Sequence, residues 1–362
     1  MKLFAVSILV SGLASAATVY QQTNLVSDIP GLAAVTDPNL KNPWGMSFSA
    51  TSPFWISDGG TNLSTLYTGA GVRNSLVVSI PGGVPTGQVF NSAGVTQFTL
   101  TPGNPALFIF AAIDGSISGW NPTVNMTNAI VKVLASPNNV YTGLALASAG
   151  TSTFLYAANF KTAHIDVYDS NFALTTLAGN FTDPTLPAGY APFNVELVGG
   201  NLYVEYAKVS ITGDEDPGPG NGFVSVFNTN GNFVRRLITQ GALNAPWGIT
   251  LAPSVFGEFS NDLLVGNFGD GRINAFDPAT GALLGTLRDG SSNPIVIDGL
   301  WALKVRLGGP NVNPNAVYFT AGINAEADGL FGSLAIPEPG TLTMMGIAML
   351  AASVAMRRKR VR

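Results

Sequence analysis

Residues 244–251 read NAPWGITL, and this stretch opens a pattern that runs through most of the chain. The same frame returns as NPWGMSF at 42–48, VYTGLAL at 140–146, APFNVEL at 191–197 and DGLWAL at 298–303. A weaker copy, AGVTQF at 93–98, falls between the first two. Because the six starts are 46 to 54 residues apart, the sequence predicts six structural repeats between residues 17 and 336.

Each repeat contains several short strands. In the repeat that starts at 244, alternating apolar runs follow at 262–267, 271–277 and 282–287. Gly, Asn and Asp residues separate these runs, as they do in tight turns. Four short strands in about fifty residues are typical of a propeller blade, so the sequence predicts an all-β protein with a six-bladed β-propeller. A pair of β-sandwiches and a right-handed β-helix are the alternatives.

The last repeat is one strand short. Its strand-like runs lie near 300–307, 316–321 and 329–335. A propeller left open exposes unpaired strand edges, so its first and last blades are normally joined. We therefore expect the run TVYQQTNLV at 18–26 to supply the outer strand of the sixth blade.

Composition excludes several classes of protein and of site. The 362 residues include no Cys and one His, which excludes disulfides, thiolate metal sites and multi-histidine sites. Only 10% of the residues are charged and 46% are hydrophobic, which excludes a disordered chain. The sequence has no phosphate-binding loop and no Gly-x-Ser-x-Gly nucleophile motif, and we expect His164 in a turn or at the surface.

The N-terminus has the pattern of an export signal. Lys2 precedes an apolar run at 3–13, which is too short to span a bilayer, and the small residues Ala14 and Ala16 follow in an A-x-A pattern. Residues 1–16 are therefore predicted to be a signal peptide that signal peptidase removes after Ala16. A buried first strand is the alternative.

The C-terminus contains three ordered elements. Pro337, Glu338 and Pro339 precede an uncharged, mostly apolar run at 341–356, and the basic residues come last. As a helix this run would be about 24 Å long, so we expect a short transmembrane helix that is marginal for spanning. The basic end would stay in the cytoplasm; it includes Arg357, Arg358, Lys359 and Arg360.

Residues 337–362 resemble the PEP-CTERM sorting signal of Gram-negative bacteria. The resemblance implies an exported precursor, anchored in the inner membrane, that an exosortase-type enzyme processes near the motif. It also implies a mature protein at the cell surface or in the extracellular matrix, in a system that makes exopolysaccharide or biofilm matrix. A plain single-span tail anchor is the alternative.

The body at 17–336 resembles NHL-type propellers. In that repeat a Pro-x-Gly strand precedes a Leu-Tyr-Val-Ala-Asp strand and an Arg-Ile-x-Val-Phe strand, and residues 244–287 match it closely. The second repeat departs most, because its predicted start at 93–98 lacks the Pro-x-Gly opening. The body also resembles an exported bacterial propeller family of unassigned activity, especially at 202–208 (LYVEYAK) and 220–224 (GNGFV).

The charge of the body argues against nucleic acid as a partner. Removal of both ends takes away six of the 17 basic residues but only one of the 21 acidic residues, which leaves a net charge of −9. Nucleic-acid binding needs a basic surface instead.

The central channel is where we expect a site, and two sets of residues are candidates. The first set, near the inner strands, could bind a sugar by stacking and hydrogen bonding; it comprises Trp44, Asn194, Trp247, Asp298 and Trp301. The second set offers oxygen ligands for Ca²⁺; it comprises Asp58, Asn159, Glu196 and Asn267. Packing between blades is the alternative reading for the tryptophans, and turn formation is the alternative for the Asn and Asp residues.

These features favour an exported binding or scaffold module for an exopolysaccharide or a surface protein over an enzyme. The alternative function is a calcium-dependent hydrolase of the lactonase or esterase type with its site in the central funnel. That alternative requires three or more of the candidate oxygen ligands to converge on one point.

Overall fold

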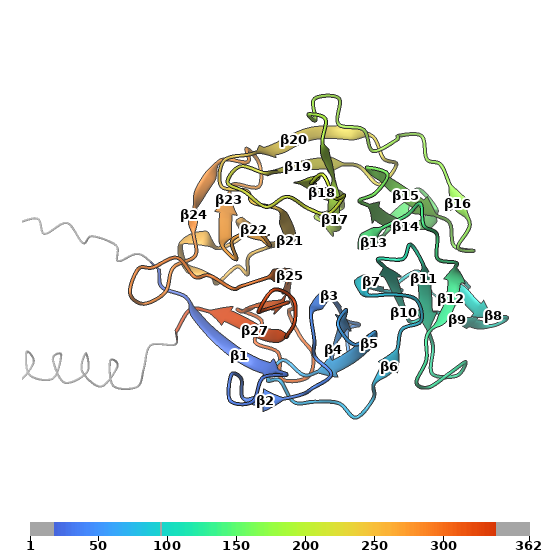
Figure 1. The fold of residues 1–362 in the computed structure, drawn as a ribbon, viewed down its shortest axis with the longest axis horizontal. Helices are drawn as coiled ribbons and strands as arrows, with labels where there is room; N and C mark the ends of the chain where they lie inside the picture. Colours follow the sequence, from blue (N-terminus) through green and yellow to red (C-terminus); the bar gives the residue numbers. More distant parts are fainter. Residues whose placement is uncertain (1–17, 95, 338–362) are drawn as a thin grey trace, which may run out of the picture.

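The computed structural model describes residues 18–94 and 96–337, which form a ring of six β-sheets around a central axis (Figure 1). The predicted six-bladed β-propeller is therefore confirmed. Its helical content in these ranges is one 3₁₀ turn, η1 (Gly257–Phe259), and no helix there is long and apolar enough to cross a membrane. The expected transmembrane helix lies outside the described residues, as do Ala14, Ala16, Glu338, Pro339, Arg357, Arg358, Lys359 and Arg360.

In four blades the strands follow each other outward from the axis in chain order. Blade 1 comprises β3 (Pro43–Ser47), β4 (Phe54–Asp58), β5 (Leu63–Tyr67) and β6 (Val78–Ser79). Blade 3 comprises β13 (Tyr141–Ala149), β14 (Ser152–Asn159), β15 (His164–Tyr168) and β16 (Leu174–Thr175). Blade 4 comprises β17 (Tyr190–Val198), β18 (Asn201–Lys208), β19 (Gly222–Phe227) and β20 (Phe233–Thr239). Blade 5 comprises β21 (Pro246–Leu251), β22 (Leu263–Asn267), β23 (Ile273–Phe276) and β24 (Leu283–Thr286).

Blade 2 begins at a different place from the one that the sequence predicts. Its strands are β7 (Pro85–Phe90), β10 (Phe108–Ala112), β11 (Ile117–Trp120) and β12 (Ile130–Val133), with a hairpin of β8 (Thr99–Thr101) and β9 (Asn104–Pro105) inserted after β7. The predicted start at 93–98 was wrong, because that stretch lies in the connection between β7 and β8. The inner strand begins instead with Pro85, Thr86 and Gly87, so this blade does have the Pro-x-Gly opening.

A shared backbone conformation supports this assignment. The residue before the opening proline has a positive φ in blades 1, 2 and 5, at Asn42 (42°), Val84 (50°) and Ala245 (45°). Few residues adopt that conformation without a structural reason, and Val does so least readily. The same turn therefore leads into the inner strand of all three blades.

Blade 6 contains the first and last strands of the described chain. Its strands are β25 (Leu300–Val305), β26 (Val317–Ala321), β27 (Leu330–Ala335), β1 (Gln21–Ser27) and β2 (Val35–Thr36). β1 pairs antiparallel with β27 from Gln21↔Ala335 to Ser27↔Leu330, so the N-terminal strand closes the ring as expected.

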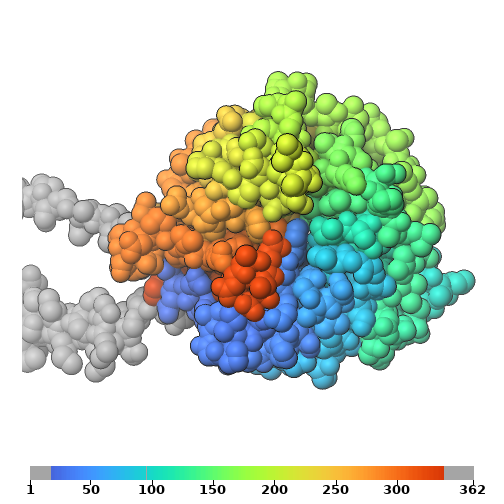
Figure 2. Space-filling view, in the orientation of Figure 1, coloured from blue at the N-terminus to red at the C-terminus, as the bar shows by residue number. Residues whose placement is uncertain are grey.

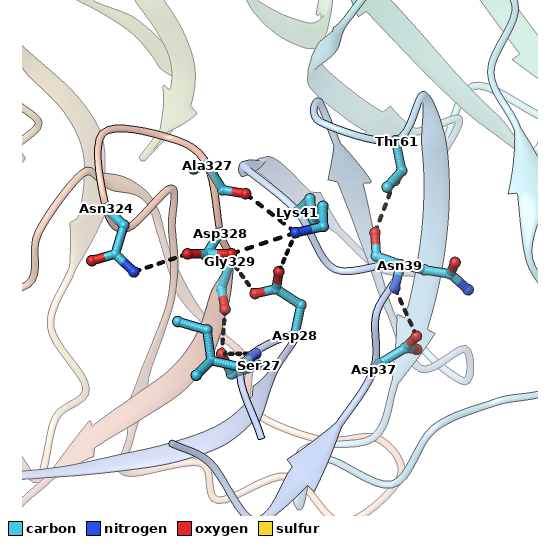
Figure 3. Close-up of polar contacts among 11 residues, drawn as sticks. Ser27, Asp28, Asp37, Asn39, Lys41, Thr61, Asn324, Ala327, Asp328 and Gly329 are labelled. Atoms are coloured by element: carbon cyan, nitrogen blue, oxygen red, sulfur yellow. Dashed lines mark hydrogen bonds and ion pairs between the residues drawn. The ribbon is translucent and has the colours of Figure 1, made fainter. Parts of the chain in front are cut away.

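Polar contacts hold the end of β1 against the loop before β27 (Figure 3). Lys41 Nζ lies 2.6 Å from Asp28 Oδ2 and 3.4 Å from Asp328 Oδ1. The backbone N–H of Gly329 donates to Asp28 Oδ1 at 2.8 Å, and Ser27 Oγ donates to the Gly329 carbonyl at 2.7 Å. These contacts join segments about 300 residues apart in the chain.

The third residue of each opening sets how closely the inner strands approach. A Cβ at Gly45, Gly87, Gly143 or Gly248 would overlap the backbone of the next blade's inner strand. Glycine is needed there because only hydrogen fits between the two strands. In blade 4 this position is Asn194, whose Nδ2 donates to the Trp247 carbonyl at 2.7 Å.

The inner strands all begin on one face of the ring, which we term the aromatic face, and end on the other, which we term the funnel face. Neighbouring strands within a blade are antiparallel, so the connections between the first and second strands lie on the funnel face. β27 also ends on that face, because Leu334 pairs with Val317, and Val317 pairs with Val305 at the end of the inner strand.

Candidate functional site

Aromatic side chains fill the axis at the aromatic face. The rings of Trp44 and Trp301 stack with centroids 3.5 Å apart, and Phe268 stacks on the other side of Trp301 at 4.2 Å. Trp247 and Phe193 contact Trp301 at 5.8 Å each. These five residues, which we term the aromatic plug, come from blades 1, 4, 5 and 6 and meet at the centre.

The three tryptophans of the first candidate set are buried in this plug. Trp44, Trp247 and Trp301 are 5%, 4% and 0% exposed, so packing explains their recurrence and their faces are covered. Two of the indole groups also bond within the protein: Trp247 Nε1 donates to the Thr142 carbonyl, and Trp301 Nε1 donates to Asn42 Oδ1, both at 3.0 Å. Trp44 Nε1 is buried without a hydrogen-bond partner.

The axis below the plug is almost closed. The space there has a volume of about 10 Å³, room for one water at most, and Gly45, Gly87 and Gly248 are among its lining residues. No open passage through the disc is visible in Figure 2. A molecule of more than a few atoms therefore has no route along the axis.

A wider cavity opens at the funnel face. It has a volume of about 350 Å³, which is within the range of small-molecule sites, and we term it the funnel. Its walls come from the ends of the inner strands and combine apolar with polar side chains. The apolar ones include Phe48, Phe90, Leu146, Leu197 and Val305, and the polar ones include Ser47, Ser92 and Thr250.

One ion pair crosses the floor of the funnel. Lys304 Nζ on β25 lies 2.5 Å from Glu196 Oε2 on β17, so the pair joins blades 4 and 6 in front of blade 5. Their side chains are 21% and 26% exposed. A lysine ammonium has three donors and a carboxylate has about four acceptor positions, so one mutual contact leaves both groups free to bond a ligand.

Gln88 supports the floor from blade 2. It is 4% exposed, and its Nε2 donates to the carbonyls of Gly45 at 2.8 Å and Trp55 at 2.6 Å. Sequence analysis missed Gln88 because the inner strand of blade 2 was misplaced. It also missed Lys304, although a lysine within the otherwise apolar run LWALKV was a usable signal.

A second carboxyl group lies behind the funnel. Glu205 on β18 pairs across the sheet with Asn194, is fully buried, and has no hydrogen-bond partner for either carboxylate oxygen. Burial, and then the negative charge of Glu196, raises the pKa of Glu205 well above its usual range. Asp58 in blade 1 is also fully buried, and desolvation raises its pKa in the same direction.

The four candidate calcium ligands belong to four different blades, and three of them contact other protein groups, whereas neither carboxylate oxygen of Asp58 has a hydrogen-bond partner. Asn159 Nδ2 donates to Asn139 Oδ1 and to Asp166 Oδ2, and Asn267 Nδ2 donates to the Ala242 carbonyl. Within residues 18–94 and 96–337, no three His, Asp or Glu side chains gather closely enough to hold a metal ion.

The remaining candidates lie outside the funnel. Asp298 is exposed before β25 and accepts a hydrogen bond from the backbone N–H of Asn324 at 2.8 Å. The loop at 209–221 between β18 and β19 carries Asp214, Glu215 and Asp216, and we term it the acidic loop; Asp216 Oδ2 lies 2.7 Å from Nζ of Lys208, the last residue of β18. His164 is exposed at the start of β15. Of the residues proposed from sequence, Glu196 alone contributes a solvent-reachable charged group to the funnel.

Comparison with known proteins identifies a sorting motif in this chain and two related proteins. Residues 335–360 match the PEP-CTERM protein-sorting motif. The uncharacterized protein R648 of Acanthamoeba polyphaga mimivirus is 36% identical over 344 residues, which cover 88% of this chain and 81% of that protein. The uncharacterized protein L690 of the same virus is 33% identical over 336 residues, which cover 88% of this chain and 86% of that protein.

Among solved structures, a streptogramin B lyase matches over 88% of this chain and 98% of its own, with a TM-score of 0.51 and 11% identity. At that identity the match supports the propeller fold alone.

Proposed function

The chain belongs to the family of the mimivirus proteins R648 and L690, and we propose that its propeller is a glycan-binding module rather than an enzyme. The sorting motif at 335–360 implies an exported, membrane-anchored precursor that an exosortase-type system processes. Display at the surface or in the matrix of a Gram-negative bacterium, and removal of residues 1–16 by signal peptidase, are parts of the same proposal.

The Glu196–Lys304 pair, in a funnel whose other lining residues are uncharged, carries this proposal. The opposite charges cancel, so a charged ligand would have to break the pair, whereas a neutral hydroxyl group can donate to Glu196 and accept from Lys304 at once. The rings of Phe48 and Phe90 in the walls suit the C–H faces of a sugar, and Ser47, Ser92 and Thr250 offer hydroxyl groups beside them. A sugar unit of an exopolysaccharide combines both requirements.

The arrangement of carboxylates favours binding over hydrolysis. Glycoside hydrolysis typically uses two carboxylates on either side of the bond that breaks. Of the described residues that line the funnel, Glu196 contributes the single carboxylate, and it is paired with Lys304. The carboxyl of Glu205 is buried behind the sheet, out of reach of a ligand.

The test is a screen of neutral and charged oligosaccharides against the purified propeller, residues 17–337, followed by calorimetric titration of the strongest binder. Lys304→Met should weaken binding about tenfold or more, because it removes a charged donor worth at least about 1.4 kcal/mol. The matched control is Lys161→Met, since Lys161 is an exposed lysine outside the funnel and its loss should leave affinity unchanged. Binding that survives Lys304→Met would contradict the proposal.

A further inference from the structure

The chain leaves the propeller on the face that holds the funnel. β27 runs from Leu330 to Ala335, and its last residue pairs with Gln21 at the funnel-face end of β1. Pro337 is exposed two residues later. The sorting motif begins at residue 335, so it starts in the last residue of the strand.

The connection to the apolar tail run is short. Six residue steps separate Ala335 from the start of the uncharged run at 341, and an extended chain covers at most about 20 Å in that length. A domain of this size is about 40–50 Å across. A tether of that reach allows the funnel face to meet the membrane that anchors the tail, and it keeps the aromatic face away.

Large apolar side chains project from the funnel face. Leu307 is 81% exposed after β25, Leu251 is 38% exposed at the end of β21, and Val255 is 59% exposed in the connection that follows. Leu197 on the funnel wall is 39% exposed. All four lie at strand ends or in connections on the funnel face, and Leu197 lines the funnel itself. Several exposed apolar side chains on one face are typical of a contact surface.

The loop that carries Leu307 is held in place. The guanidinium of Arg306 is buried and donates through Nη2 to the carbonyls of Ser49 at 2.9 Å and Ser52 at 2.7 Å, across the boundary between blades 6 and 1. These hydrogen bonds fix the backbone next to Leu307, so its side chain projects from an ordered position.

The aromatic face differs in character. The acidic loop between β18 and β19 lies there with Asp214, Glu215 and Asp216, and the loop between β26 and β27 adds Glu326 and Asp328. Charged groups of this kind favour water over a lipid surface. Ile211 in the acidic loop is an exposed apolar side chain on this face as well, so it is the charge of these loops that indicates the same orientation as the tether.

We propose that the membrane-anchored precursor rests with its funnel face against the lipid surface, so the funnel is covered until processing separates the propeller from its tail. The occupant of the apolar face is the lipid surface itself, and the four exposed residues enter its interfacial layer. This inference rests on the sorting step of the proposed function, and it makes ligand binding conditional on release.

The test uses two single-cysteine variants, since the chain has no Cys of its own. Leu307→Cys places a fluorophore on the funnel face, and the control Ile211→Cys places it on the aromatic face, at a side chain that is fully exposed. Residues 17–362 carrying either label are reconstituted into phosphatidylcholine and phosphatidylglycerol vesicles that contain lipids with a nitroxide quencher on the headgroup.

We expect quenching at position 307 several-fold stronger than at position 211, and no difference between the positions for labelled residues 17–337, which lack the tail. Equal quenching at both positions in the tail-bearing chain would overturn the orientation. If residues 17–362 do not float with the vesicles, the chain has no membrane anchor, and the proposed orientation is overturned as well. Glycan binding is measured on residues 17–337 without vesicles, so a failure of that part of the proposed function is observed separately.

Discussion

Replacing the carboxyl of Glu205 by an amide is expected to stabilise the propeller at neutral pH and to weaken the dependence of its stability on pH. The side chain is fully buried and neither oxygen has a hydrogen-bond partner. Burial raises the pKa of Glu205 well above its usual range. The folded protein therefore keeps a proton on Glu205 at pH values where the unfolded chain has released it.

The size of the effect follows from this difference in protonation. Between the pKa of glutamate in the unfolded chain, about 4.3, and the raised folded value, the folded state binds one more proton than the unfolded state. In that window the free energy of unfolding falls by about 1.4 kcal/mol per pH unit as the pH rises, whereas below it the group's contribution is fully present. Asp58 is buried in the same way and adds a second slope of the same sign.

Urea unfolding followed by circular dichroism at pH 5, 6 and 7 measures this. Glu205→Gln should unfold at higher urea than the wild type at pH 7, and its slope against pH should be smaller by up to about 1.4 kcal/mol per pH unit. Glu258→Gln is the matched control, because it removes an exposed carboxylate and should leave the slope unchanged. A Glu205→Gln curve parallel to the wild-type curve would refute the reasoning.

Three further predictions concern the plug, the ring and metal binding. Trp301→Ala should lower the free energy of unfolding by about 3–5 kcal/mol, because Trp301 is fully buried in the aromatic plug, and the exposed Leu307→Ala should change it little; urea titration measures both. Gly87→Ala should prevent soluble expression, because the new Cβ would overlap the backbone of Gly143 and Leu144; normal yield and an unchanged melting temperature would disprove this close approach. Calorimetric titration of Ca²⁺ into residues 17–336 should give no heat and no rise in melting temperature, whereas micromolar binding would restore the calcium-dependent hydrolase.

The fold could be predicted from the repeats in which each residue type has a separate structural role. In residues 246–248 the proline opens the inner strand, the tryptophan fills the axis and the glycine lets the next strand approach. Blade 2 was misplaced because Thr86 stands where blades 1, 4, 5 and 6 have a ring, and because the inserted β8–β9 hairpin lengthens the repeat. Phe98 is fully buried although it lies outside any strand, and its ring made residues 93–98 resemble an inner strand in the sequence.

The candidate site was less accessible to sequence reasoning. Glu196 was noticed as a possible metal ligand, but its partner Lys304 is more than a hundred residues away and meets it only through the curvature of the ring. The aromatic plug shows why the tryptophans were ambiguous: the same rings that could stack on a sugar also close the axis. A charged residue within an inner-strand run was the more informative signal.

A crystal structure of the propeller with the strongest-binding oligosaccharide tests the central claim most directly. We predict a sugar unit in the funnel, packed against Phe48 or Phe90, with one hydroxyl group within hydrogen-bond distance of both Glu196 and Lys304. A sugar bound at the outer strands, with the funnel empty and the ion pair undisturbed, would contradict the account.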